Sequence, residues 1–198
     1  MQVGAIRGAP PEITRETYIS VDVEASGPIP GQYSMLSVGA CLVGKKRRDF
    51  YVELKPISDG YLEGALAISG LSFSDLREHG TDAAMAMAEF ERWVESVTPV
   101  GQSPVFVAFN ATFDWMFTHY YFMRFLGRDP FGVSGLDIKA FYMGVMASNW
   151  AATSKRWIDK RFLPSRPLTH HALDDAVWQA EVFENLLAYQ CARRAGSP

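Results

Sequence analysis

The stretch that decides the fold is Tyr18–Glu24, YISVDVE, in which β-branched residues alternate with other side chains. This alternation is typical of a strand with one buried face. Residues two apart on a strand point to the same face, so Asp22 and Glu24 project together while Val21 and Val23 point the other way. The sequence therefore predicts a strand that carries two carboxylates side by side.

The segments that follow predict the rest of the sheet. Strands are expected at Met35–Val43 and Phe50–Leu54, and the basic turn Gly44–Arg48 between them favours an antiparallel meander. Two later strands are expected at residues 105–109 and 136–138, and helices at 61–68, 73–78, 82–97, 112–126, within 139–151, and at 172–192. This order predicts the α/β class, with a mixed five-stranded sheet flanked by helices.

The composition is that of an ordinary globular protein. With 198 residues, 48% hydrophobic and 21% charged, the chain suits one domain over residues 1–198 and is not a disordered polymer. Residues 1–16 contain proline and glycine and are expected to be a loose N-terminal segment. The two cysteines, Cys41 and Cys191, are too few for a disulfide framework or a cysteine zinc site.

Charge and hydropathy limit the partners. No segment resembles a signal peptide or is apolar for long enough to span a bilayer, so we expect a cytoplasmic protein with no membrane partner. The net charge of −3 argues against a protein that grips long duplex DNA by its phosphates. It does not exclude an enzyme that holds a few terminal nucleotides through metal ions, because these supply positive charge locally.

The first acidic motif is Asp22-Val23-Glu24. Two like charges ~4 Å apart repel by about 1 to 4 kcal/mol, depending on the local dielectric. A divalent cation removes this cost, and carboxylate oxygens are ligands that Mg²⁺ and Mn²⁺ prefer. Taken alone, the motif is equally typical of a solvated strand end.

The second motif follows the strand at residues 105–109 and reads Asn110-Ala111-Thr112-Phe113-Asp114. Asn110 lies at a switch from strand to helix, where α/β proteins place their sites. Asp114 lies in the first turn of the expected helix. The alternative is that Asp114 only complements the helix N-terminus, which is worth about 0.3 to 1 kcal/mol.

The third motif, His170-His171-Ala172-Leu173-Asp174-Asp175, opens the last helix. Steps of three and four residues define one face of a helix, and they place Asp175 on the apolar side and Asp174 toward solvent. A carboxylate that faces the core needs a partner. A metal ion would provide one.

The chain thus combines three motifs: DxE on a first strand, NxxxD at the start of a middle helix and HxAxxD at the start of a late helix. In this combination it resembles the DEDDh exonucleases, the DEDD exonucleases whose third motif carries histidine. Members include ribonuclease T, oligoribonuclease and the proofreading subunit of the bacterial replicative polymerase. The resemblance spans about residues 18–187. The matching positions are Asp22, Glu24, Asp114, His170 and Asp175.

The resemblance implies a ribonuclease-H-like fold and a metal-dependent 3′–5′ exonuclease. Such an enzyme hydrolyses phosphodiester bonds at the 3′ end of single-stranded DNA or RNA and releases nucleoside 5′-monophosphates. Two divalent ions, Mg²⁺ or Mn²⁺, are expected. The four acidic residues, Asp22, Glu24, Asp114 and Asp175, are the expected ligands. His170 is the expected general base, and His171 is the alternative. His170 is preferred because it lies five residues before Asp175, which is the family spacing, whereas His171 lies four residues before it.

Substrate contacts are expected just after the first motif and beside the second. The expected substrate-binding residues are Ala25, Ser26, Gly27, Asn110 and Phe113. Single strands are also held by stacking on aromatic side chains, for which Phe73 and Trp115 are further candidates, although core packing is the more common role of such residues.

Two basic groups, at residues 45–48 and 155–166, are either solvated faces or an electrostatic track for the strand. The second is better placed, because it precedes His170. Resemblance to ribonuclease T and oligoribonuclease also makes a homodimer plausible.

Two other functions remain open. The chain could be a nucleic-acid-binding module on the same fold without turnover, or a phosphodiesterase for dinucleotides and short oligonucleotides. Neither motif spacing nor composition separates DNA from RNA as the substrate.

Overall fold

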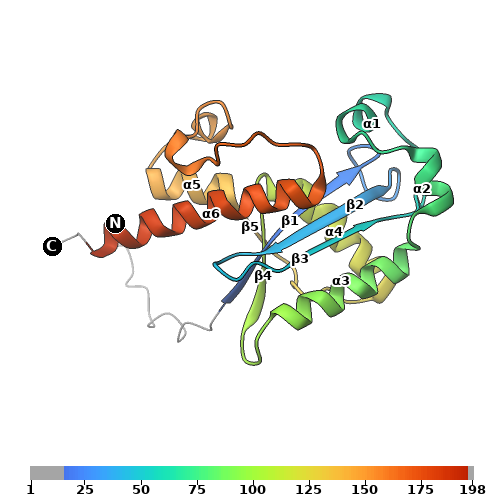
Figure 1. Cartoon of the computed structure of the whole chain (residues 1–198), viewed down its shortest axis with the longest axis horizontal. Coiled ribbons are helices and arrows are strands. Elements are labelled where there is room, and N and C mark those ends of the chain that lie inside the picture. Colours follow the sequence, from blue (N-terminus) through green and yellow to red (C-terminus); the bar gives the residue numbers. More distant parts are fainter. Residues whose placement is uncertain (1–15, 196–198) are drawn as a thin grey trace, which may run out of the picture.

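The computed structural model describes residues 16–195 (Figure 1). Its sheet has the order β3-β2-β1-β4-β5. The strands are β1 (Glu16–Ala25), β2 (Met35–Leu42), β3 (Asp49–Glu53), β4 (Ser103–Ala108) and β5 (Gly135–Asp137). β1–β2 and β2–β3 pair antiparallel, whereas β1–β4 and β4–β5 pair parallel. The predicted meander and mixed five-stranded sheet are therefore confirmed.

The helices also lie where the sequence predicted them. They are α1 (Glu63–Ser69), α2 (Phe73–His79), α3 (Ala83–Val97), α4 (Ala111–Leu126), α5 (Ile138–Met146) and α6 (Ala172–Ala195), with 3₁₀ turns η1 (Trp150–Thr153) and η2 (Lys160–Phe162). The side chain of Asp82 caps α3 by accepting from the N–H groups of Ala84 and Met85. None of the helices in the described part of the chain is both long and apolar enough to cross a membrane.

The N-terminal prediction needs one correction. Residues 1–15 of the expected loose segment lie outside the described residues. Glu16, which the expected segment included, already belongs to β1 and pairs with Ser103 of β4. Pairing with a neighbouring strand thus extends β1 two residues before the alternating pattern begins at Tyr18.

Helices cover both faces of the sheet, and each face has its own core. On one face, Val21 of β1 packs in a cluster with Phe90 of α3 and Phe117 of α4. On the other face, Val107 of β4 packs with residues of α5 and α6, among them Phe183. Figure 1 shows α6 lying across β1 and β2 on this second face. The side chains of β1 are thus divided between two layers, as the alternation predicted.

The parallel strands place their ends together. Because β1, β4 and β5 run in the same direction, their carboxyl ends meet at one edge of the sheet. We call this edge, formed by residues 22–25, 108–111 and 137–139, the carboxyl edge. All three expected motifs can reach it, because β1 ends there, β4 leads into α4 there, and α6 crosses β1.

Gly39 of β2 allows α6 to approach the sheet closely. It lies opposite Asp22 in the β1–β2 register. A Cβ atom at this position would lie 2.2 Å from the backbone nitrogen of Leu173 and 2.3 Å from the carbonyl carbon of Ala172. The first turn of α6 therefore packs on bare backbone, which brings Asp175 close to β1.

This contact predicts that Gly39→Ala destabilises the protein by about 1 to 3 kcal/mol, the usual cost of overpacking a core. The added methyl meets backbone atoms, which cannot rotate away. Urea unfolding followed by circular dichroism measures the effect.

The matched control is Gly144→Ala. Gly144 lies within α5, where a Cβ atom would point into open space, and alanine favours helix over glycine by roughly 0.5 to 1 kcal/mol. Equal stability of Gly39→Ala and the unsubstituted protein would contradict the close approach of α6.

Candidate active site

The two carboxylates of the first motif lie on one face of β1, near its carboxyl end. Asp22 and Glu24 are partly exposed, whereas their neighbours Val21 and Val23 are buried in the core. Their shared orientation is the one that the strand alternation predicted.

The second motif is held against β1 by a backbone contact. Asp114 is only 4% exposed, and its Oδ1 accepts a hydrogen bond from the N–H of Val23 at 3.1 Å. Asn110, at the N-terminus of α4, has a left-handed backbone with φ of 75°. The next N–H, that of Ala111, donates to Asp137 Oδ2 at 2.7 Å. These contacts fix the start of α4 at the carboxyl edge, with its carboxylate directed to β1.

The third motif turns sharply into α6. His170 also has a left-handed backbone, with φ of 59°. Asp175 is 5% exposed and its Oδ1 accepts from the backbone N–H of Thr169 at 3.0 Å, whereas Asp174 is exposed. The predicted difference between the two adjacent aspartates is therefore confirmed. His171 stacks on Tyr51, with ring centroids 4.4 Å apart.

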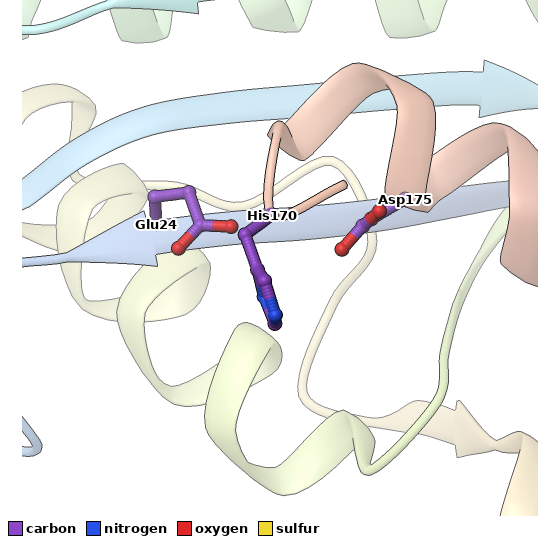
Figure 2. A group of neighbouring side chains, drawn as sticks. All are labelled: Glu24, His170 and Asp175. Carbon is purple, nitrogen blue, oxygen red and sulfur yellow. The ribbon is translucent and has the colours of Figure 1, made fainter. Parts of the chain in front are cut away.

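The structure brings residues of the first and third motifs together. Figure 2 shows Glu24 on β1, Asp175 on α6 and His170 in the segment before α6 with their side chains around one space. Each offers one potential ligand atom, and these atoms lie within 4.8 Å of one another. Oxygen donors and one imidazole are a suitable donor set for a divalent cation.

The electrostatics show that the other two carboxylates belong to the same cluster. Burial, followed by the negative charges of Asp114, Glu24 and Asp175, holds the pKa of Asp22 well above its usual range. Burial and the charges of Asp175 and Asp114 raise the pKa of Glu24 to about 8. Burial raises the pKa of Asp114 to about 7, although the N–H of Val23 opposes this shift. The four acidic residues thus repel one another, and a divalent cation would relieve that repulsion.

Comparison with known proteins shows the family to which the chain belongs. No protein-family model matches the chain. The fold is shared with a full-length 3′-exonuclease, with a TM-score of 0.72 and 13% identity over 89% of this chain and 84% of that one. It is also shared with the nuclease domain of 3′hExo, a DEDDh family member bound to rAMP, with a TM-score of 0.69 and 14% identity over 88% and 92% of the two chains.

A nearer relative decides the family. The chain is 46% identical over 169 residues to the 3′-5′ DNA exonuclease Cap18 of Escherichia coli, covering 85% of this chain and 90% of the relative. The chain belongs to the DEDDh 3′–5′ exonucleases. The family, the ribonuclease-H-like fold and the 3′–5′ exonuclease activity that the motifs predicted are confirmed.

A glutamine that the sequence did not single out contacts the acidic cluster. Gln179 is 3% exposed, and both ends of its amide are used. Its Oε1 accepts from the N–H of Phe109 at 2.7 Å, and its Nε2 donates to Asp22 Oδ1. It therefore links the end of β4 to the first carboxylate. Its position one helical turn after Asp175, on the same face of α6, was the available signal.

The charge of a lysine also acts on the acidic cluster. The charge of Lys155 lowers the pKa of Asp22, Glu24 and Asp114 against the effect of burial. Its ammonium lies 5.4 Å from the ring centre of Phe109. The sequence placed Lys155 only in a basic group, because no local pattern relates it to carboxylates so distant in the chain.

The residues after the first motif serve the fold more directly than we predicted. The buried hydroxyl of Ser26 donates to the carbonyl of Gly60 at 2.7 Å and accepts from the N–H of Ser34 at 2.9 Å. A Cβ at Gly27 would lie 2.4 Å from the ring of Tyr33. The Ser26 side chain is therefore committed to the turn, and a substrate contact by the backbone of Ser26 stays a prediction. Gly27 is needed for packing.

The other expected substrate contacts differ in exposure. Ala25 is 7% exposed. Asn110 is exposed, and its Oδ1 lies 3.5 Å from Lys139 Nζ. Phe113 is half-buried and packs on Phe117, with ring centroids 5.2 Å apart. Of this group, Asn110 and Phe113 have surface that a substrate could reach.

The raised carboxylate pKa values predict an unusual pH dependence for the ion-free exonuclease. In the unfolded chain the pKa of Glu24 is near 4.5, and in the folded chain it is about 8. The folded state binds more protons between these values, so the free energy of unfolding falls as pH rises from about 4.5 to about 8. Glu24→Gln should flatten this profile and be more stable than the parent protein at pH 8.

Thermal melts in EDTA at pH 5 and pH 8 test this. Glu78→Gln, at an exposed position of α2, is the matched control and should follow the parent profile. Adding Mn²⁺ should stabilise the parent protein more than Glu24→Gln, since a ligand stabilises the state that binds it. Parallel profiles for parent and Glu24→Gln would show that the carboxylates do not repel.

The contacts of Gln179 predict that Gln179→Leu lowers kcat by about tenfold, which corresponds to one net hydrogen bond of ~1.4 kcal/mol. Asp22 loses the donor that orients it. The control is Val182→Ala, which removes buried volume from α6 without touching the carboxylates and should reduce stability but not kcat. If both variants lose kcat in proportion to stability, Gln179 has only a structural role.

Proposed function

We propose that this exonuclease removes nucleotides one at a time from the 3′ end of single-stranded DNA and releases nucleoside 5′-monophosphates. We further propose that it uses two divalent ions, Mg²⁺ or Mn²⁺. The choice of DNA is supported by the activity named for the relative that is 46% identical. The number and kind of ions are supported by the family's motifs and by the oxygen-rich donor set.

The observation that carries the proposal is the convergence of the acidic residues. Glu24, His170 and Asp175 offer atoms within 4.8 Å of one another, and the charges of Asp22 and Asp114 act on the same space. The four carboxylates would hold the ions. When bound, the ions would neutralise this charge, acidify the attacking water and stabilise the charge on the leaving oxygen.

His170 would act as the general base. It is exposed, and one of its ring nitrogens faces the carboxylates of Glu24 and Asp175. As the water oxygen bonds to phosphorus, this nitrogen takes the proton. The bond from phosphorus to the 3′ oxygen of the preceding nucleotide breaks, and solvent protonates that oxygen. Histidine is the side chain that most often serves as a general base.

Hydrolysis of a 5′-labelled twenty-nucleotide strand with Mn²⁺ tests the proposed function. We expect a ladder of shorter products with DNA, weaker shortening with RNA of the same sequence, and no shortening by Asp22→Ala. A shifted band without shortening would support a binding module instead. Turnover confined to dinucleotides would support a phosphodiesterase.

The role of His170 predicts that His170→Ala lowers kcat by about 10²- to 10⁴-fold, the usual contribution of a general base. Calorimetric titration with Mn²⁺ should give nearly unchanged affinity. His171→Ala is the matched control and should keep most of its activity, because its ring stacks on Tyr51. Loss of Mn²⁺ affinity in His170→Ala would instead make His170 a ligand.

A further inference from the structure

A lysine of α5 lies at the carboxyl edge, close to the acidic site. Because α5 begins directly after β5, Lys139 is placed beside the start of α4. Its Nζ is 3.5 Å from Oδ1 of Asn110, four residues before Asp114. The same Nζ lies 4.3 Å from the ring centre of Trp150. A cation and an indole therefore stand together next to the site.

Two exposed tryptophans mark the segment that follows. Trp150 is 54% exposed and Trp157 is 62% exposed. Neither belongs to the hydrophobic clusters found in residues 16–195. The guanidinium of Arg156 lies 4.9 Å from the ring centre of Trp157. We call residues 149–157 the tryptophan segment. Its indoles do not serve the core, so packing does not explain them.

Three cations of this surface lack the carboxylate partners that some other cations of the described chain have. In the turn between β2 and β3, Arg47 pairs with Glu184 and serves the fold. Near the third motif, Arg166 pairs with Glu181. By contrast, within the described residues no carboxylate lies within 4.0 Å of the charged groups of three cations, which are Lys139, Lys155 and Arg156. These cations are available to a polyanion.

We propose that the tryptophan segment and Lys139 bind the single strand on the 5′ side of the bond that is cut, with a base stacked on Trp150 and a phosphate near Lys139. This inference rests on the proposed function. Aromatic rings hold bases of any sequence by stacking, and cations beside them follow the phosphates. The Lys139–Asn110 contact places this surface beside the start of α4, the helix that carries Asp114, so a strand whose 3′ end lies among the carboxylates can continue onto it.

Substrate length tests the proposal. Trp150→Ala should raise KM for a twenty-nucleotide DNA about tenfold, within the range of one lost stacking contact, with little change in kcat. The ratio of kcat/KM for the twenty-nucleotide strand to that for a dinucleotide should fall by a similar factor. Trp150→Phe should restore most of this ratio. Val100→Ala, at an exposed position before β4 and hence at the opposite edge, is the control and should keep the parent ratio.

Salt dependence gives an independent readout. Lys139→Ala should reduce the slope of log KM against log salt for the long strand by about 0.7, the value for one phosphate contact on a single strand. Lys46→Ala, in the exposed turn between β2 and β3, is the charge-matched control and should leave the slope unchanged.

The outcomes separate this inference from the proposed function. If the parent protein hydrolyses neither substrate, both fail. A second outcome is that the parent protein hydrolyses both substrates while the two variants behave like it, with the parent's ratio of kcat/KM values in Trp150→Ala and the parent's salt slope in Lys139→Ala. This result refutes the strand-binding surface alone. A lower ratio that Trp150→Phe restores, with a reduced slope for Lys139→Ala, supports it.

Discussion

Mutual repulsion among four carboxylates at the end of the central strand is the constraint on which the rest of this structure depends. Burial raises the pKa values of Asp22, Glu24 and Asp114, and the charges of the neighbouring carboxylates add to this shift at Asp22 and Glu24. Such a cluster opposes folding in the absence of cations. The surrounding structure must therefore hold it, and divalent ions offset its cost when they bind.

The fold holds the cluster through backbone contacts from three directions. Asp114 accepts a hydrogen bond from the backbone of β1, and Asp175 accepts one from the N–H of Thr169, directly before His170. Gly39 lets α6 lie directly against β2. The left-handed backbone at His170 is uncommon for a residue with a side chain, and it occurs at the histidine that faces the carboxylates. Two of the three non-glycine residues with a positive φ in the described chain, Asn110 and His170, therefore lie beside the carboxylates that repel one another.

The sequence predicted those parts of the structure that follow from local periodicity. The strand alternation indicated the common orientation of Asp22 and Glu24, and the helical repeat separated buried Asp175 from exposed Asp174. Residues whose roles depend on distant contacts were not predictable in this way. Gln179 meets Asp22 across 157 positions, and the helical repeat, which places Gln179 on the face of Asp175, does not report this partner. The burial of Ser26 likewise follows from a turn that packs on residues 34 and 60.

Anomalous diffraction from crystals grown with Mn²⁺ tests the central claim most directly, because it locates bound ions without reference to activity. We expect anomalous density in the space bounded by Asp22, Glu24 and Asp175, and loss of that density in Asp22→Asn crystals. Density that is absent from this space at saturating Mn²⁺, or that lies only elsewhere on the protein, would contradict the convergence of these carboxylates on a metal site.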